Sequence, residues 1–143
     1  MAFDPAVDYP LGSERPELAT TPSGLALGEL TLDALRTGRI SADEIRATPS
    51  TIRRQAEVAR AAGREPLAQN LERAAELASV PADTILELYS ALRPARSTAE
   101  ELEAWASRLE HEFEAPLTAA FVREAAAVYA ERSLLRERAP AAV

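Results

Sequence analysis

The sequence contains no cysteine and only one histidine, His111. The lack of cysteine excludes disulfides, thiolate nucleophiles and iron–sulfur clusters, and one imidazole is too few for a histidine-based metal site. Lysine is absent as well, so all 16 basic residues are arginine, and the formal net charge is −7. This acidic balance disfavours general binding to polyanions or membrane surfaces.

Large apolar side chains are also scarce. Aromatic residues make up 5% of the chain, and much of its 47% hydrophobic content is alanine. We therefore expect one modest core and helical faces that need a partner to cover them. No apolar run approaches about 18 residues, and the first residues lack the pattern of a signal peptide. We expect a cytoplasmic protein without a membrane partner.

Capping residues and prolines predict an all-α chain from Thr31 onward. The signals are Thr31 and Gly38 around a short helix, Ser41 with Glu44 as a capping box, Thr48–Pro49 and Gly63 around a longer helix, Pro66, Val80–Pro81 and Pro116 as helix starts, Pro94 as a stop, and Ser97 with Glu100 as a second capping box. No alternating run of strand length is present. The prediction is an open up-and-down bundle of about three longer helices with additional short helices.

Helical periodicity predicts which faces are buried. In the helix after Pro81 the predicted face consists of Ile85, Leu88, Tyr89 and Leu92. In the last helix one side carries Leu117, Phe121, Ala125 and Val128, and Val122, Ala126 and Tyr129 widen it.

The first 30 residues are predicted to form an extended arm, and residues 31–143 a helical domain. Four of the ten prolines fall in the first 22 residues, which disfavours a continuous helix or a central strand. A disordered leader is the alternative, but the segment is more apolar than a solvated tail requires. We expect the arm to contact a partner through Tyr9, Leu11 and Leu18.

The stretch "ALRPARST", residues 91–98, places Arg93 and Arg96 beside a predicted helix start. A helix N-terminus with two arginines could bind an anion, but Glu100 and Glu101 in the first turn would repel it. A hinge whose arginines pair with carboxylates of a partner is the preferred interpretation.

No motif predicts an active site in this chain. His111 lacks the second histidine of a zinc-protease helix, and its flanking glutamates indicate solvated surface. There is no Gly-x-Ser-x-Gly elbow and no glycine-rich phosphate loop. We expect no catalytic, cofactor-binding or metal-binding residue.

Residues 40–60 carry the strongest competing signal. Two capped helices around a Thr-Pro turn, with Arg53 and Arg54 near the start of the second, resemble a helix-turn-helix. The acidic remainder of the chain opposes binding to a phosphate backbone, and a basic face can equally meet an acidic protein surface. A DNA-binding regulator therefore remains the alternative to a contact of Arg53 and Arg54 with a protein partner.

Several stretches, in order along the chain, resemble the small (gamma) subunits of coenzyme B12-dependent diol and glycerol dehydratases. They are "DYPL" (8–11), "LTLDALRTGRI" (30–40), "TPSTIRRQAEVARAAGR" (48–64), "LAQNLERAAELASVP" (67–81), "ILELYSALRPARST" (85–98) and "AFVREAAAVYAER" (120–132). The similarity spans Asp8 to about Arg138, and none of the stretches is a catalytic motif.

This resemblance implies a non-catalytic subunit that packs on and stabilises the large subunit of an (αβγ)2 assembly. The reaction would convert a 1,2-diol or glycerol to an aldehyde and water. Adenosylcobalamin would be bound by the large (alpha) and medium (beta) subunits, and nucleic acid would play no part. Only about seven residues precede "DYPL", whereas some small subunits carry a longer extension linked to packaging in a microcompartment. We expect any such packaging to depend on other subunits.

Overall fold

The computed structural model describes residues 3–137, and within this range the chain is all-helical, as predicted. Residues 3–137 contain seven α-helices and three short 3-10 helices, and the only β-type pairing among them is an isolated bridge between Thr20 and Ala26. The chain divides into two compact units, residues 1–78 and 79–143. This division does not coincide with the boundary expected at residue 30, because the arm packs with the first helical hairpin.

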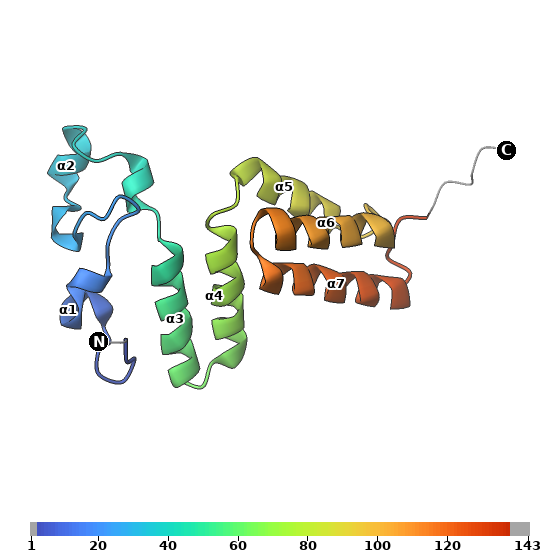
Figure 1. Ribbon diagram of the computed structural model, residues 1–143, viewed down its shortest axis with the longest axis horizontal. Helices are drawn as coiled ribbons and strands as arrows, with labels where there is room; N and C mark the ends of the chain where they lie inside the picture. Colours follow the sequence, from blue (N-terminus) through green and yellow to red (C-terminus); the bar gives the residue numbers. More distant parts are fainter. Residues whose placement is uncertain (1–2, 138–143) are drawn as a thin grey trace. The chain divides into compact units, whose positions relative to one another are not determined.

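The first unit contains the arm and two long helices (Figure 1). Its elements are α1 (Leu11–Glu14), η1 (Pro16–Leu18), η2 (Leu27–Glu29), α2 (Leu32–Arg36), η3 (Ala42–Ile45), α3 (Pro49–Ala61) and α4 (Glu65–Leu77). The predicted caps of α2 and α3 are confirmed: the Thr31 hydroxyl accepts the Ala34 N–H, and the Thr48 hydroxyl accepts the Thr51 N–H. Gly38 and Gly63 follow these helices at φ of 71° and 72°, where a side chain would be strained.

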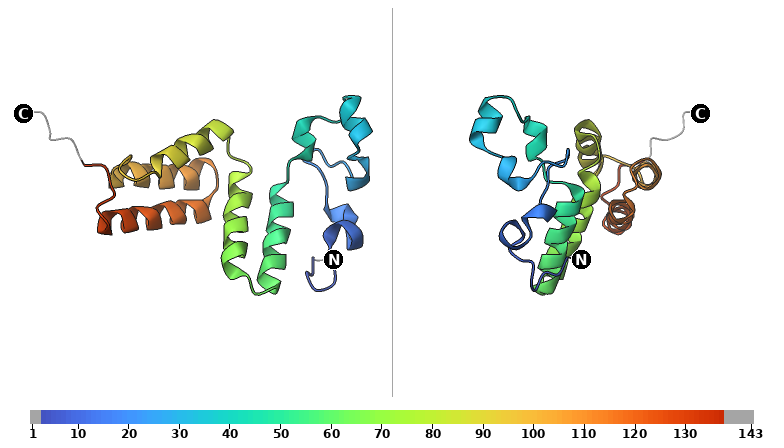
Figure 2. Two further views of the ribbon diagram at one scale, coloured as in Figure 1. Left: turned by 180° about the vertical axis from the view of Figure 1, so that it is seen from behind. Right: turned by 60° about the vertical axis from the view of Figure 1, so that its left-hand side comes forward.

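α3 and α4 lie side by side as an antiparallel hairpin (Figures 1 and 2). Their contact is built from small side chains: Ala56, Ala59 and Ala68 are buried, and Leu71 packs against them half-buried. Small residues allow two helix backbones to approach closely, but they remove little apolar area from water.

The second unit contains α5 (Ala82–Ala91), α6 (Ala99–Glu112) and α7 (Pro116–Glu131). α6 and α7 pair as a second hairpin. The largest fully buried side chains among the described residues all lie in this unit: Leu88, Leu102, Leu109 and Val122. The Tyr129 hydroxyl of α7 donates to the Leu92 carbonyl at the end of α5, at 2.6 Å. Each unit thus contains one hairpin of long helices.

Both predicted capping boxes are wrong. At α6 the box is formed one residue later, by Thr98 and Glu101. Ser97 is instead buried, and its hydroxyl donates to the Ala91 carbonyl. At residues 41–45 no side chain caps the 3-10 helix, because the Glu44 carboxylate accepts a hydrogen bond from Ser23 of the arm at 2.7 Å.

Two predicted helix faces are partly wrong. α7 buries Thr118, Ala119 and Val122, whereas Leu117 and Phe121 remain 47% and 42% exposed. On α5, Leu88 is buried as predicted, but Tyr89 is 58% exposed. In α7 the smaller residues are buried and the bulkier Leu117 and Phe121 stay exposed, a pattern that helical periodicity alone does not specify.

Candidate partner-docking surfaces

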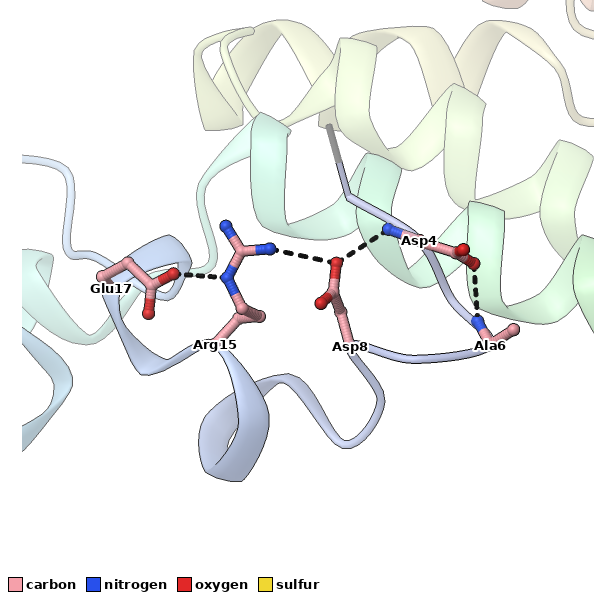
Figure 3. Close-up of polar contacts among 5 residues, drawn as sticks. All are labelled: Asp4, Ala6, Asp8, Arg15 and Glu17. Carbon is pink, nitrogen blue, oxygen red and sulfur yellow. Dashed lines mark hydrogen bonds and ion pairs between the residues drawn. The ribbon is translucent and has the colours of Figure 1, made fainter. Parts of the chain in front are cut away.

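An ion-pair cluster holds the start of the arm in one conformation (Figure 3). The Asp8 carboxylate accepts the Asp4 N–H at 2.8 Å and the Arg15 guanidinium at 3.1 Å, and Arg15 also donates to Glu17. The Asp4 N–H and Arg15 together lower the pKa of Asp8. Asp8 is buried, and these bonds replace the water that its carboxylate loses. We call Asp4, Asp8, Arg15 and Glu17 the arm staple.

Two further bonds attach the arm to the helices behind it. The Arg54 guanidinium of α3 donates to the Leu18 carbonyl at 2.6 Å, across 36 residues. Ser23 donates to Glu44, and hydrogen bonds from the Thr21 and Ser23 hydroxyls lower the pKa of Glu44. The arm of this chain therefore packs on its own α3.

A hollow lies where the arm meets the α3–α4 hairpin. It has a volume of about 350 Å³ and is lined by Tyr9, Gln55, Val58, Ala59, Ala62, Arg64, Leu67 and Leu71. Tyr9 is 56% and Leu67 43% exposed. We call this feature the Tyr9 hollow. The sequence predicted a partner contact at Tyr9 but not at Arg64 or Leu67. The tight turn at Gly63 is a signal that residues on either side of it lie close together.

The other proposed arm contacts have internal roles. Leu11 is only 6% exposed, so it anchors the arm within its own unit. Leu18 is half-buried, and its carbonyl accepts the bond from Arg54. Whether either residue also touches another subunit stays a prediction.

The two arginines of the proposed basic face, Arg53 and Arg54, differ in their exposure and in their hydrogen bonds. Arg54 is half-buried and bonded to the arm, whereas Arg53 is exposed. Nearby arginines are largely neutralised within the chain, since Arg39 pairs with Asp33, Arg46 with Asp43, and Arg60 with Glu65 and Glu72. The cationic surface is therefore much smaller than the arginine count of this region indicates.

The segment with Arg93 and Arg96 is fastened by the C-terminal residues of the second unit. The Ala95 N–H donates to the Leu134 carbonyl at 2.7 Å, and the Arg136 N–H donates to the Ser97 carbonyl at 2.9 Å. Both arginine side chains are exposed. The α6 N-terminus is already capped by Thr98 and Glu101, which disfavours the anion site.

A second hollow of about 380 Å³ lies next to this segment and was not predicted. We call it the Trp105 hollow. Arg96, Ser97, Glu101, Ala104, Trp105 and Arg108 line it. The Arg108 guanidinium carbon lies 5.2 Å from the centre of the Trp105 ring and 5.5 Å from that of Phe113, which is cation–π geometry. Arg108 also pairs with Glu112, and Glu101 with Arg136.

The geometry does not support the helix-turn-helix interpretation of residues 40–60. The element before α3 is a four-residue 3-10 helix, whereas the motif needs an α-helix that crosses the DNA backbone. Along residues 3–137, no group of three or more potential metal ligands comes together, and His111 lies exposed on α6. Of the described helices, none has the length and apolarity needed to cross a membrane.

Comparison with known proteins assigns nearly the whole chain to one family. The model of the dehydratase small subunit family matches residues 5–136. The propanediol dehydratase small subunit of Citrobacter freundii is 51% identical over 129 residues, which cover 90% of this chain and 75% of that protein. The propanediol dehydratase small subunit of Salmonella typhimurium is 50% identical with the same coverage.

Proposed function

This chain belongs to the dehydratase small subunit family, and from that premise we propose that it is the non-catalytic small subunit of an adenosylcobalamin-dependent diol or glycerol dehydratase. The enzyme would convert a 1,2-diol or glycerol to an aldehyde and water. The observation that carries the proposal is the identity of about half of all aligned residues with propanediol dehydratase small subunits, across 90% of the chain. The family match, at residues 5–136, includes most of the arm and both hairpins.

The state of the carboxylates supports a structural role. Hydrogen bonds from arginine lower the pKa of Glu17, Glu65 and Glu103. A general acid at neutral pH needs the opposite, a carboxyl whose pKa is raised by burial or by a like charge. These side chains are suited to hold the surface of the subunit together, and we assign the chemistry to the other subunits.

Neither of the two hollows described above fits a corrin. The Tyr9 hollow and the Trp105 hollow have volumes of about 350 and 380 Å³, and sites for much smaller drug-sized ligands already span roughly 300–1,000 Å³. The imidazole of His111 lies on an exposed helix face. We propose that the large and medium subunits bind adenosylcobalamin and that this chain stabilises the large subunit in a cytoplasmic (αβγ)2 assembly.

Co-expression tests this function directly. The chain is produced with candidate large and medium subunits, and co-purification is followed by an activity assay with 1,2-propanediol and added adenosylcobalamin. We expect one complex that contains all three chains and forms the aldehyde. We also expect the preparation without this chain to lose stability or activity, and the chain alone to be inactive. If wild-type protein does not join the complex, the proposed function is wrong.

A further inference from the structure

The Tyr9 hollow combines an apolar wall with an exposed tyrosine and an arginine at its edge, which are features of a docking site. We propose that this hollow receives a segment of the large subunit that inserts a bulky apolar side chain and places a carboxylate against Arg64. The inference rests on the proposed function and names the surface through which it would act.

The shape and the chemistry of the hollow favour an apolar anchor. Aliphatic side chains supply most of its wall: Val58, Ala62, Leu67 and Leu71. The alanines at the contact between α3 and α4 are small and leave the space above them unfilled. Its rim carries Tyr9 and Leu67, both more than two fifths exposed. Tyrosine is enriched among the residues that dominate binding energy at protein interfaces, where it packs in a desolvated pocket.

The arm fixes Tyr9 before any partner arrives. Its sequence neighbour Asp8 is held by the arm staple, and Leu11, two residues further on, is buried. The backbone on both sides of Tyr9 is therefore anchored, while the side chain stays exposed. Little conformational entropy is lost when such a residue binds, so more of the contact energy appears as affinity.

Arg64 selects the charge of the occupant. It is the N-cap residue between Gly63 and α4, and its N–H donates to the Ala59 carbonyl at 2.8 Å, which fixes its backbone at the edge of the hollow. Arg60, one turn earlier, is neutralised by Glu65 and Glu72, but within residues 3–137 the Arg64 guanidinium makes no ion pair. In an acidic chain, an unpaired arginine beside an apolar hollow favours a carboxylate from a partner.

The Trp105 hollow is a weaker candidate by the same criteria. Two charged groups in its wall, Arg108 and Glu101, already have partners within the chain. A ligand there would have to displace existing pairs, and it would gain less from doing so.

A pair of matched tyrosines tests the proposal in the three-subunit complex. Tyr9 and Tyr89 are 56% and 58% exposed and lie in different units, so Tyr9→Ala and Tyr89→Ala remove similar exposed surfaces. Binding of each variant to the large and medium subunits is measured by titration, with circular dichroism to verify folding. We expect Tyr9→Ala to weaken binding at least tenfold and Tyr89→Ala less than twofold.

A charge pair completes the design. Arg64→Glu is expected to weaken binding at least tenfold and to make it less sensitive to salt, whereas Arg36→Glu serves as the exposed control from the same unit. Wild-type binding by both Tyr9→Ala and Arg64→Glu would overturn the docking site and leave the proposed function intact. Equal losses in the Tyr9 and Tyr89 variants would overturn it too. So would a Tyr9-dependent self-association of the chain, because the occupant would then be a second copy.

Discussion

The two helical hairpins of this chain differ in the side chains at the contact between their helices. α3 and α4 meet through Ala56, Ala59 and Ala68, whereas α6 and α7 enclose Leu102, Leu109 and Val122, none of them measurably exposed. Apolar burial is worth about 25 cal/mol per Å², so the second hairpin has the larger internal source of stability. The first hairpin needs cover from outside, and the arm supplies part of it.

In the proposed docking arrangement, the residues that stabilise the fold and the residues that bind the partner lie in different units. The second unit holds the bulky core, and the first unit offers a shallow hollow and a pre-positioned tyrosine.

Removing a core leucine from the second unit should have the largest effect. Leu109 is 0% exposed, so Leu109→Ala should lower the free energy of unfolding by about 3 kcal/mol, through lost burial and the cavity left behind. Urea unfolding followed by the fluorescence of Trp105, the single tryptophan, reports on this unit. The control is Leu86→Ala, because Leu86 is 64% exposed. A change below about 1 kcal/mol would contradict the leucine-based core.

Enlarging a contact alanine should disturb the first unit instead. Ala68 is 0% exposed at the α3–α4 contact, so Ala68→Leu should force the helices apart and cost about 2 kcal/mol. Amide hydrogen exchange of α3 and α4 measures the loss. Ala120→Leu, at an exposed position of α7, should leave exchange in the first unit unchanged. Tolerance of leucine at position 68 would show that the helices do not depend on close approach.

Removing the Arg54 side chain should release the arm while both hairpins persist. The lost bond joins a charged donor to the Leu18 carbonyl, and bonds of this type contribute about 1.5 kcal/mol or more. Limited proteolysis within residues 15–30 should accelerate roughly tenfold in Arg54→Ala and remain unchanged in Arg53→Ala. Equal protection in the two variants would mean that other contacts hold the arm.

The smallest effect concerns acid pH. Folding lowers the pKa of Asp8 below its ordinary value of 3.8, so the ionised carboxylate stabilises the arm above that value. The stabilisation is lost as the pH falls through the lower folded-state pKa, when Asp8 becomes protonated and its bond with Arg15 weakens. Hydrogen exchange near residues 8–15 should therefore rise below about pH 4. In Asp8→Asn the same amides should exchange faster at neutral pH and lose this pH dependence.

Local signals predicted the helices well. Thr48, Pro49 and Gly63 set both ends of α3, and Pro116 starts α7, because caps and prolines act through bonds within one turn. The failures arise where a distant residue competes. Ser97 and Thr98 both precede a glutamate by three positions. The Ser97 hydroxyl donates to the Ala91 carbonyl and the Ser97 carbonyl accepts the Arg136 N–H, so Thr98 forms the cap instead.

The docking surface was less accessible to sequence analysis. The exposed apolar residue Tyr9 could be proposed from composition, but the partner of Arg54 lies 36 residues away and that of Glu44 lies 21 residues away. Nothing local distinguishes Arg60, which is paired, from Arg64, which has no ion pair among the described residues. Such contacts follow from the path of the arm over α3, which no capping or periodicity rule specifies.

The division of the chain at residue 78 also affects the order of events during synthesis. The bonds that attach the arm, from Arg54 to Leu18 and from Ser23 to Glu44, join residues that leave the ribosome before the second hairpin is made. The loop at residues 92–98 must wait for Leu134 and Arg136, which are made after the second hairpin. Because domains generally fold as units from the N-terminus, the nascent chain would present its Tyr9 surface first and complete its leucine core last.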